Sequence, residues 1–498
     1  NGKINKNALP DPDIKDIFAV YAEPENDLQR KLCRLFKEIL EINDREIGID
    51  DSFFLLGGSS LLAMKLLIDA DIPSLTFRMI YENQTVRNID RALNGVKEAI
   101  KDRPFPPDGL PLTDKQRLFL ERQLKYPGSL LYNLGLILEL DPDTDIYRLK
   151  NAVNGVLMSH PGLSVTIEKR DTEWCQYLAH APEDACPVLE LSEKELDKLT
   201  GSFLKIPAFD GSPMYRFNIV KTPKRLVFLA DVNHLICDGA SCKILLEDIF
   251  KIYDGGPAVP DHYPEVIHDI LKYEDDRRTY HKDSMPEIKK SDELMRLPRP
   301  DRQGDICILE EIEREIPFNS DKIARSAKKY GTSVSTVFMT AAAMALSRFN
   351  DTDRVLISWI CNGRNIIAGS GAVGMFLEYY PVYIDLKRSG DLKSVLSDVS
   401  NQIHRSIKGD IGFPGSEKMM IFNYLGSLES GTDNDLILDA DGLDNGDIPA
   451  TEPFTVIINE DGEKNASISI EYDAGLYLSS SIEKFADYFM DELGRIIE

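Results

Sequence analysis

The chain has 498 residues, which is too long for a single ordinary hydrophobic core, so about three packing units are expected. Its 83 acidic residues outnumber the 58 basic ones and give a formal net charge of -25. Such an acidic chain is not expected to bind nucleic acid or anionic membranes. No apolar run reaches the ~20 residues of a membrane span, and no signal peptide is visible. The seven cysteines are scattered, which favours reduced thiols in the cytoplasm over disulfides or a metal site.

The first 22 residues have the character of a tail and a linker. They open with Asn-Gly-Lys-Ile-Asn-Lys-Asn-Ala-Leu-Pro and continue with prolines and acidic residues. The opening resembles the closing motif of adenylation domains, whose usual form is Asn-Gly-Lys-Val-Asp-Arg-Lys-Ala-Leu-Pro. In that family the lysine, here Lys3, helps to activate an amino acid. The sequence contains only this motif, so we interpret residues 1–22 as an adenylation-domain tail with its linker, cut from a longer multidomain protein.

Residues 23–97 are expected to form a small all-α domain. Apolar side chains repeat at helical spacing over residues 28–40, which predicts an amphipathic helix. The glycine pair Gly57-Gly58 permits a sharp turn, and an apolar helical run follows over residues 61–68. A last helix is expected to end near Leu93, so the pattern predicts a bundle of about four helices.

Ser60 stands where the second of these helices begins. Its hydroxyl is expected at a helix N-terminus, where unpaired amide donors favour a phosphate. A lone serine at such a place is an ordinary N-cap. With its flanks, however, the stretch over residues 51–62 resembles the attachment site of peptidyl carrier domains, where 4′-phosphopantetheine is esterified to the serine. The resemblance implies that a phosphopantetheinyl transferase modifies Ser60 and that an upstream adenylation domain is a partner.

A proline-rich linker is expected over residues 98–110, and a large region of mixed character follows it. Ser333 and Thr336 are candidate caps for an alanine-rich helix in this region. Strand patterns cover residues 132–140, 225–232, 354–360 and 380–385, and helix patterns cover residues 145–159, 241–253, 321–330, 336–349 and 481–497. The region is therefore α/β or α+β, and its size predicts two lobes.

One loop in this region has the residues of a catalytic site. A hydrophobic strand leads into Asn-His-Leu-Ile-Cys-Asp-Gly over residues 233–239, and an amphipathic helix leads out. His234 is expected to be exposed after the strand, and unperturbed histidine titrates near neutrality. Asp238 can hold the loop through an ion pair, and Gly239 permits a tight turn. A single histidine near an aspartate is more often structural, so this motif alone is a weak signal.

The pieces around this loop resemble, in their order, the condensation domains of nonribosomal peptide synthetases, whose signature is His-His-x-x-x-Asp-Gly. Residues 111–120 are similar to the opening motif of the family, residues 159–163 loosely to its second motif, and residues 374–381 to a later Gly-x-Phe-Val-Asn-Thr motif. Residues 470–477 resemble a strand that these domains share. The resemblance implies a chloramphenicol-acetyltransferase-like α/β domain with lobes at residues 111–285 and 286–498 and a tunnel between them.

The same resemblance implies roles for single residues. It assigns the catalytic signature to three residues: His234, Asp238 and Gly239. Asp238 is expected to form a salt bridge with Arg364. Asn233 replaces the first histidine, and its amide can still donate and accept hydrogen bonds. Arg117, from the opening motif, is either a tunnel residue or an exposed helix arginine.

The expected function is amide formation. A donor aminoacyl or peptidyl thioester on the arm at Ser60 would react with an amine from a downstream carrier or a small amine, with His234 as general base or positioning group. One alternative is epimerization, because residues 244–249 and 422–426 are similar to epimerization domains; that family has a glutamate where this chain has Asn365. The other alternative is a degenerate fold that serves as a docking platform. Tyr379 and Tyr380 either line the substrate path or belong to the core.

Overall fold

The computed structural model describes residues 21–498 with several gaps. The gaps are at residues 41, 43–44, 59–61, 64–65, 67–69, 71, 73–74, 76–78, 81–82, 100–103, 180–181, 183, 285–295, 304–307, 365–370, 390, 408–418, 428–448 and 461–464. Lys3, Ser60 and Asn365 lie outside the described residues. The chain divides into two compact units, and the boundary between them in the sequence falls between residues 102 and 103. Within the described ranges, no helix combines the length and the apolar character needed to cross a membrane.

The first unit is helical, as predicted. Its described helices include α1 (Asp27–Ile39) and α4 (Val86–Ala99), and further helical residues lie between them in sequence. The Asn26 side chain caps α1 by accepting a hydrogen bond from the Gln29 amide. Leu32 and Phe36 of α1 are fully buried in the same core as the apolar side of α4. The buried Asp90 joins the two helices, because its Oδ2 accepts a hydrogen bond from Gln29 Nε2 at 2.7 Å.

The glycine pair of the first unit has a conformational reason. Gly57 has a φ of +98°, a region that side chains rarely adopt. Gly58 packs so closely on Phe53 that a Cβ there would lie 2.4 Å from the ring atom Cδ1. Because the Phe53 ring is fully buried, it cannot move aside to make room for a side chain at residue 58. The predicted sharp turn before residue 59 is therefore confirmed.

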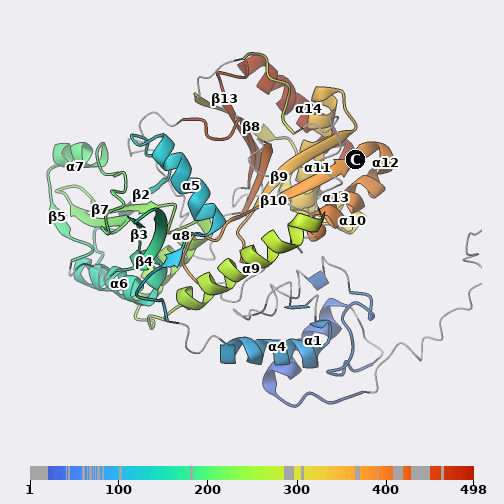
Figure 1. Ribbon diagram of the computed structural model, residues 1–498, viewed down its shortest axis with the longest axis horizontal. Coiled ribbons are helices and arrows are strands. Elements are labelled where there is room, and N and C mark those ends of the chain that lie inside the picture. The colour runs from blue at the N-terminus through green and yellow to red at the C-terminus, as the bar shows by residue number, and fades with distance from the viewer. Residues whose placement is uncertain are drawn as a thin grey trace, which may run out of the picture. The chain divides into compact units, whose positions relative to one another are not determined.

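The second unit begins with an N-lobe that contains two sheets (Figure 1). The larger sheet has the order β2-β7-β6-β5 and the smaller has the order β1-β4-β3. All eight residues of β7 are buried. The elements are β1 (Leu110–Pro111), α5 (Asp114–Lys125), β2 (Asn133–Leu140), α6 (Ile146–Ser159), η3 (Pro161–Ser164), β3 (Val165–Arg170), β4 (Glu173–Leu178), β5 (Val188–Glu190), α7 (Glu193–Thr200), β6 (Tyr215–Lys221), β7 (Leu226–Asn233), α8 (Gly239–Tyr253) and α9 (Tyr263–Ser284).

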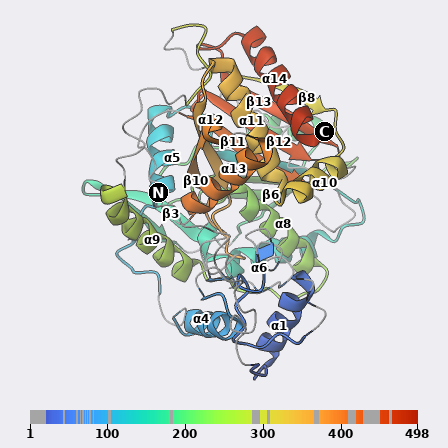
Figure 2. The same cartoon turned by 90° about the vertical axis from the view of Figure 1, so that its right-hand side faces the viewer.

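The C-lobe is built on a six-stranded sheet of order β10-β9-β11-β12-β13-β8. Strand β11 pairs in parallel with β9 and β12, and the other pairs are antiparallel. Its elements are β8 (Leu309–Ile316), α10 (Ser320–Tyr330), α11 (Val334–Asn350), β9 (Arg354–Cys361), β10 (Glu378–Asp385), α12 (Leu386–Ser389), α13 (Leu392–Ile407), β11 (Met420–Ser427), β12 (Phe454–Glu460), β13 (Ala466–Asp473) and α14 (Ser479–Ile497). Figure 2 shows the sheet with helices α11 and α13 in front of it.

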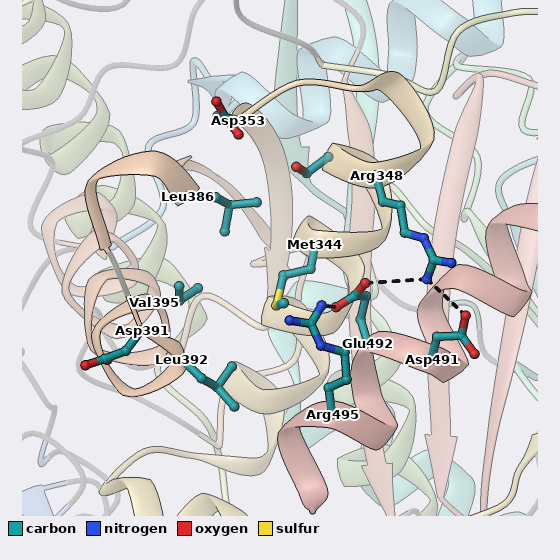
Figure 3. Close-up of a pocket in the computed structure, with 11 residues that line it drawn as sticks. Met344, Arg348, Asp353, Leu386, Asp391, Leu392, Val395, Asp491, Glu492 and Arg495 are labelled. Carbon is teal, nitrogen blue, oxygen red and sulfur yellow. Dashed lines mark hydrogen bonds and ion pairs between the residues drawn. The ribbon is translucent and has the colours of Figure 1, made fainter.

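Helix α11 is the alanine-rich helix of the prediction, and it packs against both α13 and α14. Its small side chains, such as Ala341 and Ala345, are fully buried, which lets neighbouring helices approach closely. A cavity of about 770 Å³ lies among α11, α13 and α14 (Figure 3). Its charged wall is paired internally, since Arg348 lies 2.9 Å from Asp491 and 3.6 Å from Glu492. None of the predicted site residues lines this cavity.

The predicted elements of the second unit are present, with small shifts at their ends. Ser333 is the cap of α11, and Thr336 lies inside the helix and donates its amide to Ser333 Oγ at 3.1 Å. The strand expected over residues 470–477 is partly wrong, because β13 ends at Asp473. There the carboxylate of Asp473 accepts a hydrogen bond from the Gly475 amide at 2.9 Å and turns the chain toward α14.

Candidate active site

The candidate loop follows β7, as predicted. Asn233 pairs with Asn133 of β2 in the sheet, and the next amide, that of His234, donates to the Tyr132 carbonyl at 2.7 Å. The Asn233 side chain accepts a hydrogen bond from the Leu235 amide at 3.0 Å, which starts the turn out of the strand. The side chain of Asn233 therefore stabilises the turn at the position where the family signature has its first histidine.

The His234 side chain lies partly exposed among aromatic rings. Its ring centroid is 5.2 Å from that of Phe119 and 6.4 Å from that of Tyr132, both edge-on. Phe119 and Tyr132 stack on each other at 4.4 Å. Desolvation lowers the pKa of His234 below its usual 6.5, although loop backbone groups and the Asp238 charge oppose the shift. The imidazole is therefore neutral at pH 7 and able to accept a proton.

Only one nitrogen of this imidazole faces the interior. Nδ1 of His234 is buried, and in the described part of the chain no group meets the geometry of a hydrogen bond to it. Sequence reasoning did not find Phe119 and Tyr132. The available signal was that Phe119 lies on the helix of the opening motif and that Tyr132 directly precedes β2, the strand that pairs with β7.

Asp238 caps α8 and joins the two lobes. Its Oδ1 accepts a hydrogen bond from the Ser241 amide at 2.8 Å, so α8 begins two residues earlier than predicted. Its Oδ2 accepts hydrogen bonds from Arg364 Nη1 at 2.9 Å and from the Phe376 amide at 3.0 Å. The side chains of Asp238 and Arg364 are 2% and 7% exposed. The ion pair implied by the resemblance is therefore present, and both of its side chains are almost completely buried.

The serine of the first turn of α8 extends this network into the C-lobe. Ser241 Oγ accepts hydrogen bonds from Arg364 Nη2 at 2.7 Å and from the Gly374 amide at 2.9 Å, and it donates to the Gly374 carbonyl at 2.8 Å. Arg364 Nη2 also donates to the Ala372 carbonyl at 3.2 Å. The loop is thus held against residues 372–376 of the C-lobe, the start of the Gly374 motif.

Two further predicted residues have a different setting from the one expected. Gly239 is the first residue of α8, its φ is not in the left-handed region, and an added Cβ would meet open space. The expected tight turn at Gly239 is therefore wrong, because the Asp238 cap turns the chain. Arg117 is exposed on α5, and its Nη2 donates to the Leu112 carbonyl at 3.3 Å. This setting corresponds to the exposed helix arginine and not to the tunnel residue.

The tyrosines and cysteines near the loop are buried. Tyr379 and Tyr380 on β10 are 7% and 0% exposed. Cys237 and Cys242 flank Asp238 with their sulfurs 3.5 Å apart, and both pack as small apolar side chains. Among the described residues, no group of three or more histidine, cysteine, aspartate or glutamate side chains is placed to hold a metal ion.

The second motif forms a buried charge cluster in the N-lobe. His160 lies between two carboxylates, with Nδ1 2.8 Å from Asp261 Oδ2 and Nε2 3.0 Å from Asp248 Oδ2. These hydrogen bonds and charges raise the pKa of His160 to about 9 against the cost of burial. Asp261 Oδ2 also accepts a hydrogen bond from the Val373 amide at 2.9 Å. The motif therefore fixes the segment that precedes Gly374.

The expected attachment site of the arm is seen only through its neighbours, because Ser60 lies outside the described residues. Before it, Gly57 turns the chain and the Leu55 side chain is 66% exposed. After it, Ala63 and Leu66 are fully buried at helical spacing. The described residues on the two sides are therefore an exposed turn and a packed helical segment.

Comparison with known proteins identifies both units. The family model described as "Condensation domain" matches residues 108–498, and the one described as "Phosphopantetheine attachment site" matches residues 30–93. The chain is 23% identical to surfactin synthase subunit 1 of Bacillus subtilis (strain 168) and 24% identical to gramicidin S synthase 2 of Brevibacillus brevis. Both alignments cover the whole chain but only 15% and 12% of those relatives.

Solved structures share the fold of the second unit. The epimerization domain from the third module of tyrocidine synthetase B matches with a TM-score of 0.62 and 18% identity, over 78% of this chain and 96% of that one. The condensation domain of the Monacolin K polyketide synthase matches with a TM-score of 0.60 and 13% identity, over 78% of this chain and 97% of that one.

The two family models decide the identity of the units. The first unit is a phosphopantetheine-bearing carrier domain of the kind found in nonribosomal peptide synthetases, and the chain belongs to the condensation-domain family.

Proposed function

We propose that the second unit catalyses formation of an amide bond between an acyl thioester and an amine. The phosphopantetheine arm, esterified to Ser60, would supply the thiol that holds the acyl group. A partly exposed, neutral imidazole on a loop fixed by both lobes is the observation that supports this proposal most. The residue roles and the domain limits at residues 22, 97, 110 and 285 are part of the proposal.

Each loop residue has a role that its surroundings support. The second nitrogen of His234, Nε2, accepts a proton from the amine or orients it, because Nδ1 is buried. Asp238 and Arg364 keep the loop in place from opposite lobes. The open space beside Gly239 leaves room for the approaching substrate. Orientation of the two reactants supplies much of the rate, and the base adds about 10²–10⁴-fold.

The test is intact-protein mass spectrometry of the full chain. A phosphopantetheinyl transferase and an acyl donor load Ser60, and an acceptor carrier or small amine is then added. We expect transfer in the unaltered chain and a loss of about 10²-fold or more in His234→Ala. The control is His262→Ala, because His262 is an exposed histidine. Equal transfer by the two variants would remove His234 from this role.

Epimerization is the second candidate. Residues 422–426, which are similar to epimerization domains, lie on β11 in the middle of the C-lobe sheet. That reaction needs a second acid or base, and the amide of Asn365 cannot move a proton. Chiral analysis of the group on Ser60, without any amine present, separates the two reactions: inversion would favour epimerization.

The partners follow from the proposed reaction. They are a phosphopantetheinyl transferase, an upstream adenylation domain and a downstream carrier or small amine. A docking platform without catalysis is the remaining alternative. Binding of a loaded acceptor carrier with neither transfer nor inversion would support it.

A further inference from the structure

Helix α5 contacts the site with one face. Lys115, Phe119 and Arg122 stand at positions i, i+4 and i+7, so they share that face. The middle residue, Phe119, contacts the His234 ring. The residues one turn before and one turn after it each reach across to the C-lobe. In both views α5 lies beside β10 (Figure 1, Figure 2).

The two outer residues form ion pairs with C-lobe carboxylates. Lys115 Nζ lies 3.7 Å from Glu378 Oε2 and 4.9 Å from the ring centre of Tyr379, both on β10. Arg122 pairs with Glu452, just before β12. The side chains are 13% and 8% exposed in the first pair and 21% and 19% in the second. Pairs this sheltered from water are screened much less than surface pairs.

The pair of Arg122 with Glu452 lies close to the aromatic rings around the imidazole. Burial raises the pKa of the Tyr132 phenol to about 12, and Arg122 and Glu452 lie near enough for their charges to influence it. Tyr132 in turn stacks on Phe119, and its carbonyl accepts the His234 amide. The ion pairs thus flank a continuous stack that ends at the catalytic loop.

We propose that Lys115 and Arg122 are positioning residues, whose ion pairs with Glu378 and Glu452 close the C-lobe over the Phe119–His234 contact and limit the access of water to the partly exposed imidazole. The consequence of this closure is the low basicity of His234. The inference rests on the proposed function only for its effect on turnover. Closure itself is measured independently of turnover.

The sign of the change in the pKa of His234 tests the inference. The groups that face this imidazole are Asp238 on its own loop, Phe119 on α5 and Tyr132 before β2. In Glu452→Arg or Glu378→Lys, an added positive charge alone would lower the pKa of His234. Loss of closure would instead hydrate the ring and raise its pKa toward 6.5.

The experiment uses the full chain labelled with [13Cε1]histidine. NMR titration follows His234, whose signal is assigned with His234→Ala. We expect Glu452→Arg to raise the pKa of His234 and to lower kcat about tenfold with a smaller effect on KM. The double variant Arg122→Glu/Glu452→Arg should restore both values. The control swap, Lys150→Asp/Asp184→Lys, exchanges a pair 2.8 Å apart within the N-lobe and should change neither.

An unchanged or lowered pKa of His234 in both Glu452→Arg and Glu378→Lys would overturn the inference, as would a double variant that stays as impaired as the single ones. If a charge reversal prevents folding, the neutral variants Glu452→Gln and Lys115→Met take its place, with the same expected rise. A raised pKa with no change in turnover would keep the closure and contradict the proposed role of His234.

Discussion

The ion pair between Asp238 and Arg364 should be among the costliest side-chain contacts to break in the second unit. Asp238→Asn keeps the shape of the side chain and the oxygen that caps α8, but it removes the negative charge. Arg364 would then stay charged and almost buried. Arg364→Met leaves the opposite problem. The buried carboxylate of Asp238 then has no cation beside it and keeps only the hydrogen bonds from the amides of Ser241 and Phe376.

Breaking one side of a buried pair costs about 3–5 kcal/mol. We expect Arg364→Met near the upper end, since no other cation contacts Asp238 in the described part of the chain. Asp238→Asn should cost about 3 kcal/mol, because Arg364 keeps acceptors at Ser241 and Ala372. The double variant Asp238→Asn/Arg364→Met leaves no buried charge behind and should lower the free energy of unfolding by only about 2 kcal/mol. The two changes are therefore coupled.

Tryptophan fluorescence in urea can measure this coupling for the second unit alone. The chain has two tryptophans, and both, Trp174 on β4 and Trp359 on β9, lie in that unit. One reports the N-lobe and the other the C-lobe, so single replacements by phenylalanine show whether the lobes unfold together. If the double variant loses the sum of the two single losses to within about 0.5 kcal/mol, the reasoning about a shared buried charge is refuted.

Four further outcomes are expected. Burial raises the pKa of Glu274 to about 8, and carboxylates raise that of His160 to about 9. Both pKa values are raised, so the stability that these groups contribute is complete below pH 4.5 and 6.5, respectively, and is lost as the pH rises through about 8 and 9. Glu274→Gln should flatten the fall of Tm between pH 6 and 9, and a fall as steep as that of the unaltered chain would contradict this. Gly363→Ala should destabilise the second unit by more than ~2 kcal/mol, because φ is +67° and the added Cβ would lie 1.8 Å from a backbone oxygen. Gly239→Ala should leave urea unfolding unchanged, so any loss of amide formation would come from the lost space. Asp90→Ala should cost about 1–3 kcal/mol in carrier stability by circular dichroism and leave the tryptophan transition in place.

Local patterns in the sequence predicted most of the fold. The strand over residues 225–232 follows from a continuous apolar run, which the structure buries on both faces, and the helix over residues 241–253 follows from its periodicity, which buries one face. The start of α8 could not be placed, since Asp238 was assigned to the ion pair and its second oxygen also caps the helix. The end of β13 was misplaced for a similar reason, because one aspartate, Asp473, turns the chain.

The site was predicted only in part, because the contacts around the loop join residues that are far apart in the sequence. His234 and Asp238 share one loop and could be recognised by their spacing. Arg122 and Glu452 are separated by 330 positions, and no local pattern relates them. The stacking of Phe119 on Tyr132 likewise requires the register of β2 with β7 and the packing of α5. These contacts depend on tertiary structure that no single segment encodes.

The Asp238–Arg364 contact limits how the two halves of this molecule can be recombined. The two residues are 126 positions apart and sit in different lobes. A chimera with its crossover between them takes each partner from a different parent. Because a buried unpaired charge is so costly, such a hybrid folds only when both parents carry the matching residue. Crossovers before residue 238 or after residue 376 keep the pair together with the Phe376 amide that donates to Asp238, and they are the better choice for exchanging parts between synthetases.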